Sequence, residues 1–335
     1  MTGVCELCHH KLRLSNPGGI RICSECCLLF PFNYIASDVE FKYNLHSFFH
    51  SNYNFNLEKL LYLKVNPLDM NDIEKDHDID KPLTNFEDIN FPFQMSKNCK
   101  YMFCDEFHDK FKVVNQKVSI LHVNARSLRH NFDDLLMMIS TLDFKFTAIA
   151  ITETWFNSCT PLELFNIPGY KFNYSNRTDK IGGGVALYVD ENVNYIVRSD
   201  LKLSSAESES LFIEIREIKR KPVTIGCVYR APNTDITNFI ESLEVCFKDV
   251  NLCNDMYLVG DFNINLLNAD THCKTDDFLN VLFSNNMYPL ITKPTRISST
   301  SATLIDNIFT NVCSDQFKNG ILYQTTYLYF VLMYQ

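Results

Sequence analysis

The 335-residue sequence lacks several features that would each place a protein in a definite class. No apolar run approaches the ~20 residues that a membrane-spanning helix needs. The N-terminal residues contain no apolar segment of the secretory-signal type. Basic residues are not in excess either, because the net charge is -9. We therefore predict an intracellular protein without a membrane span, and one that does not coat nucleic acid by charge alone.

Cysteine is abundant, and its odd count of 13 argues against a complete disulfide framework. Two CxxC pairs, Cys5 with Cys8 and Cys23 with Cys26, are separated by fourteen residues. This spacing is typical of a Zn²⁺ site with four thiolate ligands. We therefore predict a small zinc-ribbon-like module over residues 1–30. A cluster of ordinary buried cysteines is the alternative.

The remaining chain divides near residue 116. The composition of residues 31–115 indicates a linker with some helix and an acidic loop at its centre. From residue 116 onward, apolar runs of strand length alternate with segments of helical periodicity, which indicates a layered α/β sandwich. The predicted strands cover residues 118–124, 147–155, 181–189, 210–218, 223–230, 256–263 and 302–311. The predicted helices cover residues 132–142, 234–250 and 275–286, with Thr234 as the N-cap of the second.

Five short motifs place polar side chains at the ends of these strands. They are HVNARSL (His122 to Leu128), ITETW (Ile151 to Trp155), VYRAP (Val228 to Pro232), GDFN (Gly260 to Asn263) and LIDNIF (Leu304 to Phe309). Polar groups at the ends of buried strands converge on one edge of a sheet. Amide, carboxylate and phenol groups together suit a divalent metal ion, a phosphodiester and a water.

In order and spacing, these motifs together with NRTDKIGGGVALYV and ATLIDNIFTN resemble the endonuclease/exonuclease/phosphatase superfamily. Within it they are most similar to the apurinic-type endonuclease domain of non-LTR (LINE-type, jockey-like) retrotransposons. The resemblance covers residues 116–312. It implies a four-layered α/β sandwich, in which two packed β-sheets are flanked by helices, and a Mg²⁺-dependent enzyme that nicks DNA. A reverse transcriptase would be expected downstream in an intact element and is absent here.

The resemblance assigns catalytic roles to individual residues. Glu153 would be the main Mg²⁺ ligand, and Asn124 would orient the site and the phosphate. Asp261 would position or deprotonate the attacking water. Asn263 and Tyr229 would donate hydrogen bonds to the phosphate.

Three further residues are candidate substrate contacts. Arg126 stands where relatives often carry an acid or amide, so we assign it to a phosphate. Arg230 faces either the DNA or the solvent. Thr295 matches a phosphate-contacting threonine of the family, although an ordinary turn threonine is the equal alternative.

The C-terminal sequence departs from the family pattern. In relatives, the residue that matches Asp306 orients a histidine in a final SDH motif. Here YLYFVLMYQ follows residue 326, and no histidine lies beyond His272. We therefore expect residues 313–335 to be a divergent, truncated tail that lacks this histidine and the strands that carry it. The nuclease would then be impaired or inactive, and His272 is a weak substitute.

Two other functions remain open at this point. One is a non-catalytic binder, in which the zinc module holds nucleic acid or protein and the nuclease fold is a decayed scaffold. The other is a phosphatase that acts on inositol lipids or nucleotides, although the motifs favour the retroelement branch. Nuclear localisation would follow from a nuclease function and has no sequence signal of its own.

Overall fold

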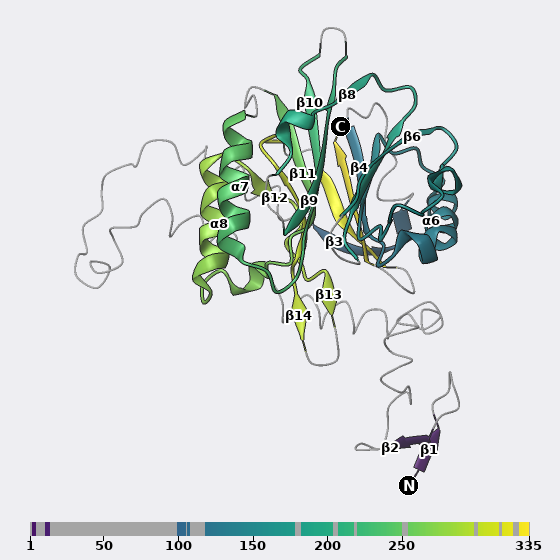
Figure 1. Ribbon diagram of the computed structural model, residues 1–335. Coiled ribbons are helices and arrows are strands. Elements are labelled where there is room, and N and C mark those ends of the chain that lie inside the picture. The colour runs from purple at the N-terminus through teal and green to yellow at the C-terminus, as the bar shows by residue number, and fades with distance from the viewer. Residues whose placement is uncertain are drawn as a thin grey trace, which may run out of the picture.

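Figure 1 shows the computed structural model, in which two central β-sheets lie between helices. The described residues are 2–4, 11–13, 99–104, 106–107, 118–177, 182–203, 207–217, 220–249, 254–297, 301–314, 317–323 and 328–334. Near the N-terminus, β1 (Thr2–Val4) pairs antiparallel with β2 (Lys11–Arg13). The predicted zinc ligands Cys5, Cys8, Cys23 and Cys26 lie outside the described residues, as does most of the predicted linker.

The first large sheet has seven strands in the order β3-β16-β17-β4-β5-β7-β6. Its pairs are antiparallel except for two parallel ones, β16 with β3 and β4 with β5. The strands are β3 (Lys100–Phe103), β4 (Val118–Asn124), β5 (Ala148–Thr152), β6 (Tyr170–Ser175), β7 (Val185–Asp190), β16 (Lys318–Tyr323) and β17 (Leu328–Tyr334).

The second large sheet has six strands in the order β12-β15-β11-β10-β9-β8. Only β10 and β11 run parallel. The strands are β8 (Tyr195–Val197), β9 (Ser208–Ile215), β10 (Val223–Arg230), β11 (Asp255–Asp261), β12 (Tyr288–Pro289) and β15 (Asp306–Thr310). A separate short ladder joins β13 (Arg296–Ile297) to β14 (Ala302–Thr303).

Helices cover the outer face of each sheet, so the layers follow the order helix, sheet, sheet, helix (Figure 1). Helix α6 (Leu128–Leu142) packs on the first sheet through Leu135, Met138 and Leu142. Helices α7 (Ile236–Asp249) and α8 (Cys273–Ser284) cover the second sheet. Short 3-10 helices follow at η1 (Leu162–Phe165), η2 (Ser199–Leu201) and η3 (Leu266–Asn268).

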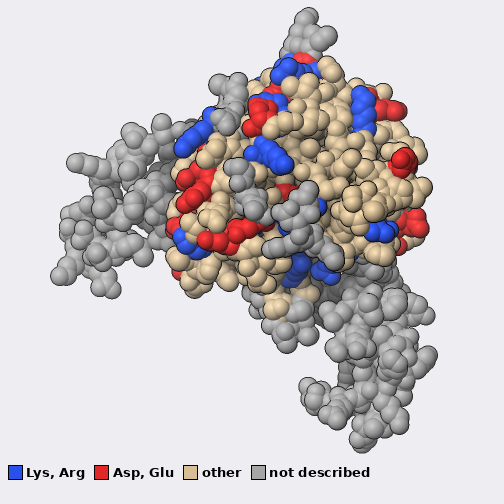
Figure 2. Space-filling model, viewed as in Figure 1, with Lys and Arg blue, Asp and Glu red and all other residues tan. Residues whose placement is uncertain are grey.

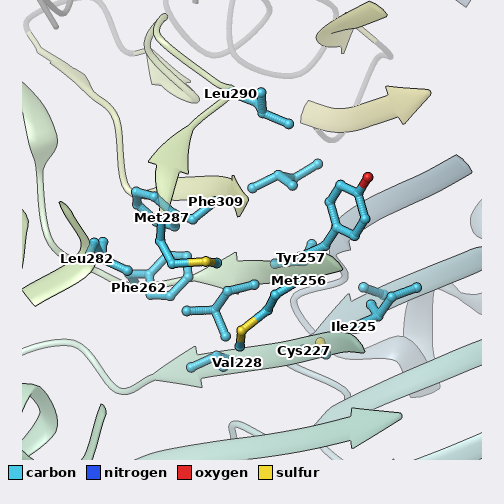
Figure 3. Close-up of a cluster of buried hydrophobic side chains, with 14 of the residues drawn as sticks. Ile225, Cys227, Val228, Met256, Tyr257, Phe262, Leu282, Met287, Leu290 and Phe309 are labelled. Atoms are coloured by element: carbon cyan, nitrogen blue, oxygen red, sulfur yellow. The ribbon is translucent and has the colours of Figure 1, made fainter. Parts of the chain in front are cut away.

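Apolar side chains fill both the space between the sheets and the space beneath the helices. Successive residues of a strand point to opposite faces, so strands buried on both faces carry unbroken apolar runs. Figure 3 shows the cluster around β10 and β11, where Phe262 and Phe309 pack with ring centroids 5.2 Å apart. Each such buried ring contributes about 1.5–3 kcal/mol relative to an exposed one. Between the sheets, the Sγ of Cys227 lies 3.5 Å from the carbonyl oxygen of Ile151.

The structure confirms the predicted α/β sandwich of two packed sheets flanked by helices. Two strands, β16 and β17, lie within residues 313–335, where a divergent, truncated tail was expected. Strand β17 pairs antiparallel with β4 and with β16, so it lies inside the first sheet. Strand β3, from the predicted linker, pairs with β16 in the same sheet. The pairings of β17 with β4 and of β3 with β16 are long-range, and local sequence patterns carry no information about them.

One helix boundary also differs from the prediction. Helix α7 begins at Ile236, and Oδ1 of Asp235 accepts a hydrogen bond from the backbone N–H of Thr237 at 2.8 Å. Asp235 is therefore the N-cap, because an N-cap side chain bonds the N–H two or three residues later. The hydroxyl of Thr234 instead donates to the carbonyl of Ala231.

Candidate functional site

The polar motifs meet because of how the strands run. Strands β4 and β5 are parallel, so Asn124 and the residue after β5, Glu153, lie at the same edge of the first sheet. Strands β10 and β11 are parallel as well, and they bring Tyr229 beside Asp261. Strand β15 is antiparallel to β11 and starts where β11 ends, with Asp306 directly opposite Asp261. Five of the predicted residues thus lie at neighbouring strand ends.

Asn124 connects the two sheets. Its Nδ2 donates to Oε1 of Glu153 and to Oδ2 of Asp261, both at 2.7 Å. Its Oδ1 accepts the backbone N–H of Arg126 at 3.1 Å, which sets the direction of the amide. Because one nitrogen contacts both carboxylates, Glu153 and Asp261 are held close together across the sandwich.

Glu153 sits on a strained turn. It adopts a φ of 57°, and Trp155 adopts 56°, which are left-handed values that non-glycine residues seldom take. The turn is anchored to the glycine-rich segment before β7. The backbone N–H groups of Thr154 and Trp155 donate to the carbonyls of Gly184 and Gly183. The indole N–H of Trp155, which is 38% exposed, donates to Oε2 of Glu153 at 3.3 Å.

Asp261 is fully buried at the end of β11. Its neighbour Gly260 has no space for a side chain, because a Cβ there would collide with the carbonyl oxygen of Val228 on β10. Oδ1 of Asp261 accepts the backbone N–H of Asn263 at 3.0 Å. Burial, together with the charge of Asp306, raises the pKa of Asp261 well above its usual value. Asp261 therefore has a higher proton affinity than an exposed aspartate.

The side chain of Thr295 holds the carboxylate of Asp306 in place. The Oγ1 of Thr295 donates to Oδ2 of Asp306 at 2.7 Å and accepts the backbone N–H groups of Ile305 and Asp306. Thr295 is 1% exposed, so its hydroxyl is committed inside the protein. This corrects its assignment as a substrate contact. The other oxygen of Asp306, Oδ1, is buried without a hydrogen-bond partner.

Arg296 was not predicted from the sequence, and it lies at the centre of the acidic cluster. Its Nη2 is 2.6 Å from Oδ2 of Asp261 and 3.9 Å from Oε1 of Glu153. Its Nε is 3.7 Å from Oδ2 of Asp306. Burial by itself lowers the pKa of Arg296, but the charges of the three carboxylates outweigh it and raise that pKa. No local motif pointed to Arg296, because the acids that surround it come from the turn after β5 and from β11 and β15.

Arg230 was predicted to contact substrate, and the structure corrects this prediction. It is 2% exposed. Its Nε donates to the carbonyl of Phe262 and its Nη2 to the carbonyl of Asn263, both at 2.8 Å. In return, Nδ2 of Asn263 donates to the carbonyl of Arg230 at 2.7 Å. Arg230 therefore holds the GDFN turn in shape and is not available to a ligand.

The remaining predicted residues differ in exposure. Tyr229 is 5% exposed, and the guanidinium carbon of Arg177 lies 5.7 Å from its ring centroid. Burial, together with the charges of Glu153 and Asp261, raises the pKa of Tyr229, so its phenol stays protonated. Arg126 is exposed at a φ of 43°, beside Asn124. His272 caps α8 by accepting the backbone N–H of Thr275.

Carboxylate and amide oxygens are the donor types that Mg²⁺ prefers. Within the residues that the structure describes, however, no three or more His, Cys, Asp or Glu residues are grouped so that they could hold a metal ion. The guanidinium of Arg296 lies among Glu153, Asp261 and Asp306 instead. The chemistry of these side chains therefore fits a divalent cation, while their arrangement accommodates an arginine.

No protein-family model matches this chain. No curated protein matches it in sequence. Among solved structures, an AP endonuclease from Leishmania major matches with a TM-score of 0.53 and 11% identity, over 73% of this chain and 98% of that one. An AP endonuclease from Archaeoglobus fulgidus matches with a TM-score of 0.46 and 14% identity, over 65% and 99%. A protein of the endonuclease/exonuclease/phosphatase family from Leptotrichia buccalis matches with a TM-score of 0.43 and 13% identity, over 64% and 98%.

The match to the Leishmania major structure shows a shared fold, which is the fold that the sequence motifs predicted. Separately, the part of the chain that the structure describes contains no helix with the length and apolar character to cross a membrane.

Proposed function

We propose that this chain is a Mg²⁺-dependent endonuclease domain that cleaves phosphodiester bonds in DNA, of the type found in non-LTR retrotransposons. The observation that supports it most directly is the Asn124 bridge, which holds Glu153 and Asp261 together at the common edge of the two sheets. The shared fold with an AP endonuclease agrees with this proposal. The fold alone does not fix the substrate, so the residues at that edge carry the proposal.

Glu153 would hold Mg²⁺, which when bound would withdraw charge from the phosphate and the leaving oxygen. Asp261 would accept a proton from the attacking water, because its raised pKa favours the protonated product. Asn124 and the N–H of Asn263 would keep the Asp261 carboxylate in one orientation. The protonated phenol of Tyr229 would donate to a phosphate oxygen.

The activity is expected to be weak. The Oδ1 of Asp306, the residue that the family resemblance pairs with a histidine, is buried without a hydrogen-bond partner. In the part of the chain that the structure describes, no histidine therefore bonds this oxygen. The surface view in Figure 2 shows Lys and Arg interspersed with Asp and Glu, so a strong basic patch does not compensate on that face. A decayed, non-catalytic scaffold that still binds DNA is the second candidate, and these two observations favour it.

The test is a nicking assay on supercoiled plasmid with and without Mg²⁺. We expect slow nicking by the wild-type chain and a loss of about 100-fold or more in Glu153→Gln, since this substitution removes the charge of the metal ligand. The matched control is Glu217→Gln, because Glu217 is exposed beside Arg220 on the far side of the β9–β10 hairpin. If the wild type nicks DNA no faster than Glu153→Gln does, the proposed endonuclease activity is contradicted. The non-catalytic, DNA-binding scaffold is then the remaining candidate.

A further inference from the structure

Arg296 has a position that neither the motifs nor the family resemblance assigns. Its guanidinium contacts Asp261 at 2.6 Å and lies within 4 Å of both Glu153 and Asp306. Three carboxylates, one in the turn after β5 and the others on β11 and β15, therefore share one positive group. The Arg296 side chain is 30% exposed while that of Asp261 is fully buried, so the guanidinium also closes this part of the site toward solvent.

The surrounding backbone keeps Arg296 in this place. The preceding residue, Thr295, is tied to Asp306 through its hydroxyl and to the carbonyl of Thr303 through its backbone N–H. Arg296 itself pairs with Thr303 in the β13–β14 ladder. Both ends of the side chain are thus fixed, one by the ladder and the other by the carboxylates. Arginine suits such a position because its planar fork donates to several acceptors and stays charged at any working pH.

The fixed positive charge of the Arg296 guanidinium opposes the binding of a metal cation at the same place. Glu153, Asp261 and Asp306 would together attract a divalent ion, but Arg296 already offsets one of their charges and repels an incoming ion over a few ångströms. We propose that Arg296 is the internal counter-ion of this site and sets how tightly the site binds a divalent cation. This inference rests on the proposed function, since it takes Glu153 to be a metal ligand.

The experiment measures the Mn²⁺ dissociation constant of the full chain by electron paramagnetic resonance of free Mn²⁺, in the absence of DNA. Repeating each titration with Glu153→Gln added isolates the contribution of this site. Arg296→Gln keeps amide N–H donors but removes the charge, so it should bind Mn²⁺ at least about tenfold more tightly than the wild type. Arg296→Lys keeps the charge and should stay within about threefold of the wild type.

Arg220→Gln is the matched control, because Arg220 is exposed and lies at the opposite end of the β9–β10 hairpin from Tyr229. It should leave the Mn²⁺ affinity unchanged. Should Arg296→Gln fail to fold, Arg296→Met provides the same test, since methionine keeps a long unbranched side chain and removes the charge. Its Mn²⁺ affinity should likewise exceed that of the wild type by at least about tenfold.

An affinity of Arg296→Gln equal to or weaker than that of the wild type would overturn the inference. So would an increase that persists when Glu153→Gln is added. Plasmid nicking by the wild type can still succeed in either case, so the proposed endonuclease would stand. Conversely, an absence of nicking together with a tenfold gain in Mn²⁺ affinity would reject the endonuclease and keep the role of Arg296.

Discussion

Thr295 shows how one hydroxyl can hold a buried carboxylate in place. It donates to Asp306 and accepts two backbone N–H groups, and it is almost fully buried. Because a buried polar group without partners is costly, these three bonds act as a unit. The same residue positions Arg296, which follows it directly. From the sequence alone, Thr295 could be either a substrate contact or a turn residue. In the structure it instead holds the carboxylate of Asp306.

At the residue scale, we predict that Thr295→Val lowers the free energy of unfolding by about 1–3 kcal/mol. The change keeps the shape of the side chain but leaves Asp306 and two backbone N–H groups without their partner. Urea denaturation measures the effect, and Thr295→Ser, which keeps the hydroxyl, is the control. A loss in Thr295→Val no larger than that in Thr295→Ser would contradict the prediction that the hydrogen bonds of the hydroxyl dominate.

At the scale of elements, β17 differs most from what the sequence predicted, because a divergent tail was expected where this strand lies. It runs between β16 and β4, so both of its edges are hydrogen-bonded. Its sequence looked like an apolar tail, since a continuous apolar run does not say which strands it will join. Without β17, the edges of β4 and β16 would be exposed, and open edges promote association between molecules. The C-terminal segment is thus part of the sheet that carries Asn124.

We predict that Val331→Pro disrupts this sheet. Val331 pairs with Gly320 on one side and Leu121 on the other, and proline removes an N–H that a central strand cannot spare. The expected loss is about 3 kcal/mol or more, accompanied by aggregation. Thermal unfolding and size-exclusion chromatography measure both effects. Tyr334→Pro, at the end of the strand, is the matched control and should have a much smaller effect.

At the scale of the whole molecule, the sandwich places charged and polar groups between its two sheets. His122 on β4 is fully buried, and its Nε2 lies 3.2 Å from Oγ1 of Thr152. Burial lowers the pKa of His122 from 6.5 to about 4; the charge of Asp306 opposes this shift and that of Arg296 adds to it. Between these two pH values, His122 therefore stays neutral in the folded protein, whereas it takes up a proton in the unfolded chain.

This difference predicts how stability depends on pH. The folded-state pKa is below the unfolded value, so the contribution of His122 is intact above pH 6.5 and is lost as pH falls toward 4. The loss amounts to at most about 3 kcal/mol. Denaturant unfolding over this pH range should show a shallower decline in His122→Gln than in the wild type. Identical slopes in the two proteins would show that His122 does not titrate differently on folding.

The local pattern of the sequence determined many of the elements. Strands β4 and β10 have the predicted bounds, and α8 lies within two residues of its prediction at either end. The spacing of apolar residues predicts these elements correctly, because each one buries one face or both faces. That spacing can be read from residues that are neighbours in the sequence. The motif residues Asn124, Glu153, Asp261 and Asp306 could also be chosen from the sequence, with the family resemblance as guide. The predicted zinc site stays a prediction, because it lies outside the described residues.

Only the tertiary structure decided which polar groups meet. Arg296, which no motif indicated, contacts Asp261. Thr295 bonds Asp306 and not a substrate, and Arg230 holds a turn. Whether an arginine faces a ligand, three carboxylates or two carbonyls depends on strands far apart in the chain. The same holds for β17, whose partners lie some two hundred residues away in β4 and next to it in β16. Local sequence determines which residues form a strand, and the pairing of distant strands determines what each side chain contacts.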